Sequence, residues 1–318
     1  MITLSGLTKR YGDTVAVDGL TLDIEAGRVT GFLGPNGAGK STTMRMILGL
    51  DHPTSGLALI GGLPYAALAH PLRRVGALLD AKAVHPARSA RAHLLAQAQS
   101  NGIPVRRVGE VLETVGLAAV AGRRVGAFSL GMHQRLGVAG ALLGDPEVLV
   151  FDEPVNGLDP DGVRWVRELV RAQAARGRTV LLSSHLMSEM QLTADQLVII
   201  GRGRLLADTS MADFLARSTA TSVRVRVPDP DDRRALLGDL RAQKETQVEE
   251  RLDGEMCVRG RTAVEVGDLA HRLGVRLHRL DEAQASLEEA YMELTAQSVE
   301  YGTPSSALAA TATDRDEL

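Results

Sequence analysis

Apolar residues gather in short unbroken runs along the first two thirds of the chain. Val29–Leu33 and Val148–Phe151 are such runs, and strands buried on both faces of a parallel sheet have this pattern. Thr179–His185 predicts a further buried strand, which ends in a histidine. Amphipathic stretches with helical spacing, for example Thr42–Leu50 and Val163–Ala175, lie between or after the runs. This alternation of buried strands and helices predicts an α/β fold.

The N-terminal stretch has the pattern of a different kind of sheet. Ile2–Leu7 alternates apolar with small or polar residues, as a half-buried antiparallel strand does. After a predicted turn at Lys9–Asp13, Val15–Asp18 and Gly19–Ile24 are expected to form a strand pair, and Leu57–Ile60 a further strand. These segments predict an antiparallel β subdomain beside the α/β core.

Strand patterns vanish from about residue 85 to residue 143, and helical spacing replaces them. This stretch predicts a helical insertion between two parts of the core. The pattern changes again near Ser218, so residues 1–218 are expected to form one domain.

Residues 219–298 are expected to form a small second domain of the α+β class. Ser222–Val227 alternates strictly and predicts a strand, while Ala263–Leu273 and Ala285–Leu294 predict helices. Thr, Ser, Ala and Asp are frequent in residues 299–318, which predicts a disordered tail.

Composition narrows the functional classes. The chain has 318 residues and a formal net charge of -3, and only 3% of its residues are aromatic. Nucleic-acid surfaces rely on basic stripes or stacking aromatics, so no nucleic-acid partner is expected. Cys257 is the only cysteine, which excludes an internal disulfide and fits a reducing cytosol. No apolar run reaches the roughly 18 residues of a spanning helix, so we expect a cytoplasmic protein that meets a membrane only through a partner.

One loop carries the strongest chemical signal. Gly34–Ser41 reads Gly-Pro-Asn-Gly-Ala-Gly-Lys-Ser between a predicted strand and a predicted helix, which is the context of a phosphate-binding loop. Glycines let backbone N–H groups approach a phosphate, and the helix N-terminus adds a positive dipole end. Lys40 is expected to reach the β- and γ-phosphates, and Ser41 to ligate Mg²⁺. The expected nucleotide-binding residues here are Gly34, Pro35, Asn36, Gly37, Ala38, Gly39, Lys40, Ser41 and Thr42.

Two carboxylates follow the second buried run. Asp152 and Glu153 come directly after Val148–Phe151, at the end of a strand, where α/β sheets bind ligands. Asp152 is expected to hold Mg²⁺, and Glu153 to act on a water molecule. Beside a phosphate loop, this pair predicts hydrolysis of a nucleotide.

Three positions allow two interpretations from the residues alone. Tyr11 lies in a predicted turn, and it either stacks on an adenine or is an ordinary surface tyrosine. Ser129 is a candidate helix N-cap, which either exposes N–H groups to an anion or, more commonly, only caps the helix. His185 ends a predicted buried strand and is either a γ-phosphate contact or a loop histidine.

Taken together, residues 1–218 resemble the ATP-binding subunit of an ABC transporter. The motifs of this family occur in family order as Walker A at Gly34–Ser41, the signature at Phe128–Met132 followed by Gln134–Arg135, Walker B at Leu149–Glu153, the D-loop at Gly157–Asp159 and the switch histidine at His185. Tyr11 falls at the adenine-stacking position of the family. Residues 219–298 resemble the C-terminal extension of daunorubicin-resistance-type subunits.

The chain departs from the family pattern in two places. The signature has Leu130 and Met132 where Gly and Gln are usual, a variant associated with bacterial drug and antibiotic exporters. Asp80 stands where the family has the Q-loop glutamine. Asp80 either pairs with nearby Lys82 on a solvated loop or engages Mg²⁺, directly or through water, only in the closed dimer that the resemblance implies.

The resemblance implies a RecA-like P-loop NTPase core with an antiparallel β subdomain, a helical insertion and a small C-terminal α+β domain. It implies ATP and Mg²⁺ as cofactors and ATP hydrolysis that drives export of a drug, antibiotic or lipid-like compound through a separate membrane permease. The subunit would be peripheral on the inner face of the membrane. Glu153 would be the general base, and Lys40, His185 and Mg²⁺ would stabilise the transferring phosphoryl group.

The resemblance further implies a head-to-tail homodimer. Each ATP would lie between the Walker A loop of one chain and the signature of the other. The additional nucleotide-binding residues implied are Tyr11, Ser129, Leu130, Gly131, Met132 and Asp159.

Two other functions compete with transport. Soluble ABC ATPases that act on nucleic acid or ribosomes have long coiled-coil arms or tandem cassettes, and this sequence shows neither. A regulatory nucleotide switch without turnover would not require Glu153.

Overall fold

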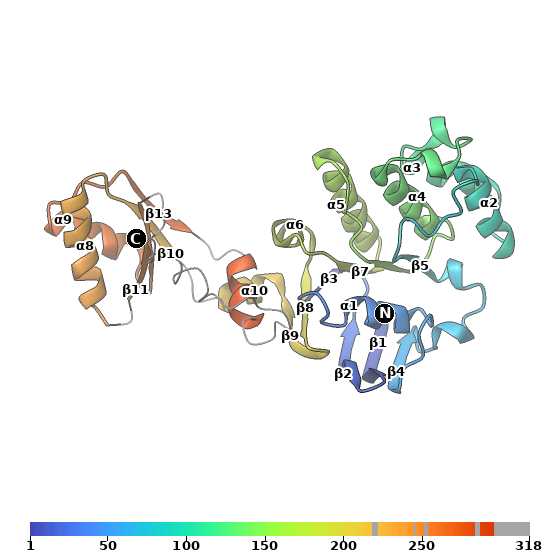
Figure 1. Cartoon of the computed structure of the whole chain (residues 1–318), viewed down its shortest axis with the longest axis horizontal. Coiled ribbons are helices and arrows are strands. Elements are labelled where there is room, and N and C mark those ends of the chain that lie inside the picture. Colours follow the sequence, from blue (N-terminus) through green and yellow to red (C-terminus); the bar gives the residue numbers. More distant parts are fainter. Residues whose placement is uncertain (218–221, 245, 251–253, 284–286, 296–318) are drawn as a thin grey trace, which may run out of the picture.

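In the computed structural model of the protein, residues 1–217, 222–244, 246–250, 254–283 and 287–295 are described. A six-stranded sheet lies at the centre of residues 1–217, which we call the N-terminal unit (Figure 1). In spatial order its strands are β5 (Val75–Leu78), β6 (Val148–Phe151), β7 (Thr179–Ser183), β3 (Val29–Leu33), β8 (Gln196–Gly201) and β9 (Arg204–Ser210). Every residue of β3, β6 and β7 is buried, and the pairings from β5 through β8 are parallel. The predicted α/β fold is confirmed.

A three-stranded antiparallel sheet, in the order β2-β1-β4, lies beside the central sheet. Its strands are β1 (Ile2–Tyr11), β2 (Thr14–Ile24) and β4 (Ser55–Ile60). The strand pair predicted within residues 15–24 is wrong, because β2 is one strand. Gly19 has a φ of 64°, and the register of β2 against β1 shifts at this point, so a β-bulge carries the strand through the glycine. The turn predicted at Lys9–Asp13 is also too long, because β1 continues to Tyr11.

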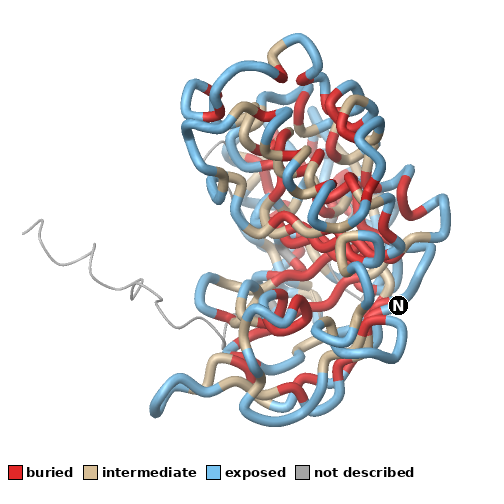
Figure 2. Tube along the Cα trace, turned by 90° about the vertical axis from the view of Figure 1, so that its right-hand side faces the viewer, coloured by how far each residue is buried: buried red, intermediate tan, exposed pale blue. Residues whose placement is uncertain are grey.

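Helices cover both faces of the central sheet. They are α1 (Lys40–Ile47), α2 (Ala90–Ser100), α3 (Arg106–Thr114), α4 (Leu130–Leu142), α5 (Pro160–Ala175), α6 (Met187–Thr193) and α7 (Met211–Arg217). Short 3-10 turns lie at Tyr65–Ala67, Pro71–Arg73, Ala118–Val120 and Val125–Ala127. One core joins the sheet to α2–α6, and a second joins it to α1 and the antiparallel sheet. Buried residues accordingly concentrate along the strands and the inward helix faces (Figure 2).

The second domain has its own sheet and core. Its elements are β10 (Ser222–Arg226), α8 (Pro230–Ala242), β11 (Gln247–Glu250), β12 (Glu255–Arg259), α9 (Ala263–Arg272) and β13 (Arg279–Ala283). The strand order is β11-β12-β10-β13 with antiparallel neighbours, which is the β-α-β-β-α-β arrangement of ferredoxin-like domains. Val223 and Val225 of β10 pack with Leu236 of α8 and Val266 of α9 on one face of this sheet.

The last described helix, α10 (Leu287–Thr295), does not pack with α8 and α9. It lies beside α6 and α7 of the N-terminal unit (Figure 1). Leu287 and Tyr291 are buried in the core of that unit, and the backbone N–H of Leu287 donates to Gln191 Oε1 of α6 at 3.2 Å. Burial raises the pKa of Tyr291 to about 12.

The range 219–298 expected for the second domain therefore includes a helix, α10, that the N-terminal unit buries. The tail expected at 299–318 lies outside the described residues.

We expect Leu287→Ala to lower the free energy of unfolding of the N-terminal unit by about 2–5 kcal/mol, because it removes a fully buried side chain from its core. The single tryptophan, Trp165, lies on α5 of that unit, so its fluorescence during denaturation reports this unit. Met292→Ala on the same helix is the control, since Met292 is exposed and its loss should change stability by no more than about 0.5 kcal/mol. Equal effects of the two substitutions would contradict the observed packing.

Candidate functional site

The phosphate loop connects β3 to α1 and forms one wall of a cavity of about 350 Å³. Gly37 and Gly39 have φ values of 81° and 103°, in the left-handed region that favours glycine. A Cβ on Gly39 would lie 2.5 Å from the carbonyl oxygen of Ala16, so no larger residue fits there. The cavity is lined by Ala16, Pro35, Asn36, Gly37, Ala38, Gly39, Lys40, Ser41, Thr42, Leu79, Asp152 and Glu153. The loop and both carboxylates therefore share one cavity.

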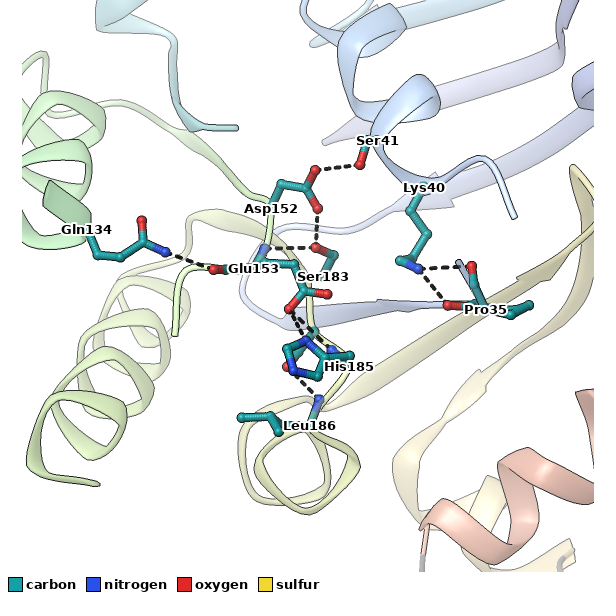
Figure 3. Close-up of polar contacts among 11 residues, drawn as sticks. Pro35, Lys40, Ser41, Gln134, Asp152, Glu153, Ser183, His185 and Leu186 are labelled. Atoms are coloured by element: carbon teal, nitrogen blue, oxygen red, sulfur yellow. Dashed lines mark hydrogen bonds and ion pairs between the residues drawn. The ribbon is translucent and has the colours of Figure 1, made fainter. Parts of the chain in front are cut away.

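Lys40 bends back over the loop that precedes it. Its Nζ donates to the carbonyl oxygens of Gly34 at 2.5 Å and Pro35 at 3.2 Å (Figure 3). Burial lowers the pKa of Lys40, and the nearby charges of Glu153 and Asp152 oppose that shift. The ammonium is thus partly removed from water beside a cavity. This arrangement favours an exchange of its carbonyl partners for phosphate oxygens, because a charge-assisted contact is the stronger one.

Asp152 is held by two hydroxyl groups. Ser41 Oγ at the start of α1 donates to Asp152 Oδ2 at 2.7 Å, and Ser183 Oγ at the end of β7 donates to Asp152 Oδ1 at 2.5 Å (Figure 3). A hydroxyl and a carboxylate are the hard oxygen ligands that Mg²⁺ prefers, so Ser41 and Asp152 fit this ion. Among the described residues, no group of three or more His, Cys, Asp or Glu side chains is arranged to hold a metal. Two protein oxygens suit Mg²⁺, which usually takes its other ligands from phosphates and water.

Glu153 is fixed by contacts from three directions. Its backbone N–H donates to Ser183 Oγ at 3.0 Å, and its carbonyl oxygen accepts from Gln134 Nε2 of α4 at 2.9 Å. Its carboxylate Oε2 lies 2.7 Å from the ring nitrogen Nδ1 of His185, and it also accepts a hydrogen bond from the backbone N–H of His185 at 3.3 Å (Figure 3). Glu153 has a φ of 50°, an unusual backbone conformation for a residue with a side chain. Such strain is retained when the surroundings fix it, and it is typical of functional positions.

Ser183 and Gln134 are site residues that the sequence analysis did not assign. Ser183 contacts both Asp152 and Glu153, and Gln134 anchors the backbone of Glu153. Ser183 could have been found from its position as the last residue of β7. This strand pairs in parallel with β6, which leads to Asp152 and Glu153, and neighbouring parallel strands end at the same edge of a sheet. The partner of Gln134 is 19 residues away and becomes visible only in the fold.

Several predicted site residues do not line the cavity, and Gly34, His185, Tyr11 and Asp80 are among them. Tyr11 is half exposed, its hydroxyl donates to Asp51 at 3.1 Å, and Lys9 Nζ lies 4.9 Å from the centre of its ring. Asp80 Oδ1 accepts from the backbone N–H of Lys82 at 2.8 Å, and Asp80 lines a neighbouring cavity between the core and α4. Adenine stacking by Tyr11 and Mg²⁺ contact by Asp80 stay predictions.

The signature residues also lie outside the phosphate cavity of their own chain. Ser129 caps α4, and its Oγ accepts from the Met132 N–H at 3.3 Å. Leu130, which is half exposed, lies against Gly157 of the next loop. Asp159 caps α5 through its Oδ1, which accepts from Gly162 N at 2.9 Å. Roles for Ser129–Met132 and Asp159 in nucleotide binding stay predictions.

The fold and the cavity define a P-loop nucleoside triphosphatase, with a phosphate loop after the strand β3 and two carboxylates after β6, which is separated from β3 by the strand β7. A family model described as ABC transporter matches residues 17–156. The chain belongs to the family of ABC transporter ATP-binding subunits, which are ATPases.

Named relatives extend this match. The bacitracin transport ATP-binding protein of Bacillus licheniformis is 44% identical over 211 residues, 65% of this chain and 69% of that protein. The Nod factor export ATP-binding protein I of Burkholderia orbicola is 35% identical over 309 residues, 94% of this chain and 98% of that protein. A solved ATP-binding subunit of an ABC transporter superposes with a TM-score of 0.63 at 27% identity, over 68% of this chain and 92% of that one.

A second family model, described as a domain of unknown function, matches residues 221–288. This range begins one residue before β10 and ends just inside α10, so it covers the β-α-β-β-α-β domain. Within the part of the chain that the structure describes, no helix has the length and apolar character needed to span a membrane.

Proposed function

We propose that this subunit hydrolyses ATP to drive export of a drug, antibiotic or lipid-like compound through a separate membrane permease. The observation that carries the proposal is the single cavity that joins the phosphate loop to Asp152 and Glu153. The named relatives act in bacitracin transport and Nod factor export, which supports an exported compound. The subunit would then be peripheral on the inner face of the membrane, bound to its permease.

We infer a role for each side chain of the site from its position. Glu153 accepts a proton from water as the water oxygen attacks the γ-phosphorus and the bond to the ADP oxygen breaks. Lys40 neutralises charge on the phosphates, and His185 orients Glu153 through their 2.7 Å contact. Ser41 and Asp152 would hold Mg²⁺, which supplies further charge neutralisation at the phosphates.

A head-to-tail homodimer would complete the site. The N-terminus of α4, capped by Ser129, presents N–H groups outside the phosphate cavity of its own chain. In a dimer that pairs this helix end with the cavity of a second copy, those N–H groups would face the γ-phosphate. ATP would then hold two chains together, and its hydrolysis would release them.

Gly131→Asp tests this dimer, because it places a carboxylate at the N-terminus of α4. The nearest atoms to a Cβ at Gly131 are 3.3 Å away or more, so Gly131→Ala is a size control. We expect Gly131→Asp chains to bind ATP normally but to lose at least about 100-fold in ATPase rate, as expected for a loss of transition-state stabilisation.

Mixing Gly131→Asp with Glu153→Gln chains then distinguishes a site shared between chains from a site within one chain. A mixed head-to-tail dimer has one site with both lesions and one site with none. An equal mixture should regain about a quarter of the unmodified rate, because half of the dimers are mixed and one of their two sites is intact. A mixture as inactive as its components would contradict the shared site.

Export through a permease is tested by purifying the tagged Glu153→Gln chain with ATP from detergent-treated membranes of its own cells. We expect a polytopic membrane protein to copurify in stoichiometric amount, and the untagged chain is the control. Copurification of ribosomes or nucleic acid in its place would contradict the proposal and favour the soluble class of ABC ATPases.

A further inference from the structure

We propose that the C-terminal β-α-β-β-α-β domain binds a phosphate monoester in a basic pocket at one end of its sheet. The pocket has a volume of about 540 Å³, within the range of small-molecule sites. It is lined by Arg226, Val227, Pro228, Arg233, Gly254, His278 and Arg279. It belongs to a different domain from the ATP site, so the inference does not depend on the proposed export function.

Residues of β10, α8 and β13 line the basic pocket, together with Gly254 just before β12. Arg226 is the last residue of β10, and Arg279 is the first residue of the adjacent strand β13. The His278 N–H donates to the Arg226 carbonyl oxygen at 2.8 Å, which fixes the backbone of the two strands at this end. Arg233 reaches the pocket from the first turns of α8.

Gly254 lets Arg233 approach the backbone closely. A Cβ at Gly254 would lie 3.0 Å from Arg233 Nη1, so a larger residue would push the guanidinium away. Gly254 also has a φ of 78°, which favours glycine. The guanidinium of Arg233 therefore lies against the backbone of Gly254, the residue before β12.

Charge is uneven in the basic pocket, because the described residues that line it include three arginines and no carboxylate. Arg279 is neutralised by the protein itself, since its Nη1 lies 3.4 Å from Glu255 Oε1 and its Nε contacts Asp281. Arg226 and Arg233 have no carboxylate partner within ion-pair distance in the part of the chain that the structure describes. Two arginines without a described carboxylate partner thus line one cavity.

This charge pattern matches a phosphate monoester better than other anions. A guanidinium presents a planar pair of donors that fits two phosphoryl oxygens, and two guanidinium groups match the charge of a dianion. A single carboxylate would leave one of the two charges uncompensated. The phosphate monoester can come from a soluble metabolite or from a lipid headgroup, and both sources share this chemistry.

The test uses the full chain saturated with ADP and Mg²⁺, so that the phosphate loop is occupied. Glycerol 3-phosphate is titrated at physiological salt by calorimetry, and acetate serves as the monocarboxylate comparison. We expect saturable binding of glycerol 3-phosphate, weakened at least tenfold in the Arg226→Ala/Arg233→Ala double variant and unchanged in Arg234→Ala. Arg234 lies next to Arg233 on α8 but pairs with Asp231, so Arg234→Ala is a control for the loss of a neighbouring arginine that does not line the pocket.

Vesicles separate the two sources of the ligand. Cosedimentation with phosphatidylcholine vesicles that contain phosphatidic acid is measured for the same chains. Association that depends on Arg226 and Arg233 supports a lipid headgroup, and calorimetric binding without such association supports a soluble monoester.

The single variants Arg226→Gln and Arg233→Gln keep the test valid if the double variant does not fold, since each retains most of the side-chain length. Each is expected to weaken binding at least threefold. Binding of neither phosphate probe by the unmodified chain would overturn the proposal. Equal binding by all variants, or equal binding of acetate, would also overturn it.

Discussion

Glu153→Gln is expected to bind ATP as tightly as the unmodified chain while its turnover falls by at least about 100-fold, the usual contribution of a general base. The carboxylate lies in the phosphate cavity and contacts His185 rather than the phosphate loop. An amide in its place keeps an oxygen that can accept the His185 N–H, so the backbone contacts of residue 153 should persist. What is lost is the ability to take a proton from the attacking water.

Three measurements check this expectation: steady-state phosphate release, ATP binding by calorimetry, and elution volume with ATP and Mg²⁺. The variant should elute as a dimer, because ATP bridges the two chains and is not consumed. Glu147→Gln is a matched control, since Glu147 is exposed and pairs with Arg74 outside the cavity. Turnover near the unmodified rate would remove Glu153 from the role of base.

Lys40→Ala is expected to weaken ATP binding itself by about 10- to 100-fold. The substitution deletes a charge-assisted contact to the phosphates, a class of interaction worth about 1.5–3 kcal/mol. Alanine is a good helix former, so the start of α1 should persist and the loss should fall on the ligand. The expected loss is greater for ATP than for AMP, which lacks the β- and γ-phosphates.

Fluorescence or calorimetric titration with ATP and AMP measures the effect of Lys40→Ala. Lys244→Ala is the control, because Lys244 lies in the second domain and removes the same charge from the chain. An unchanged ATP affinity, or an equal loss for both nucleotides, would show that Lys40 does not contact the outer phosphates.

The parts of the site that lie close together along the chain could be predicted from the sequence. The strand, loop and helix around Lys40 are consecutive, and glycine, lysine and serine at fixed spacing define their chemistry without help from distant residues. Asp152 and Glu153 were placed in the same way, because an all-apolar run predicts a buried strand and ligands bind at the ends of such strands. The same reasoning failed at Gly19, where a β-bulge lets one strand continue through a residue that usually marks a turn.

Other features depended on partners that the sequence does not place. β13 was not predicted, because its residues Arg279–Ala283 are mostly polar and its backbone pairs with β10, more than 50 residues earlier. The helix α10 was expected in the second domain, yet it is buried against α6, about 100 residues earlier in the chain. A helix pattern shows which face is apolar, but it does not show which surface will cover that face.

The sequence by itself therefore determined the α/β class, the phosphate loop and the two carboxylates, since these follow from local periodicity and from residue types at short spacing. Only the tertiary structure decided that Ser183 holds Asp152, that Gln134 and His185 hold Glu153, and that the basic pocket forms at the end of a second sheet. It also decided that the signature lies outside the phosphate cavity of its own chain. The physical reason is that such contacts join segments far apart in the chain, and their geometry is set by how whole elements pack against one another.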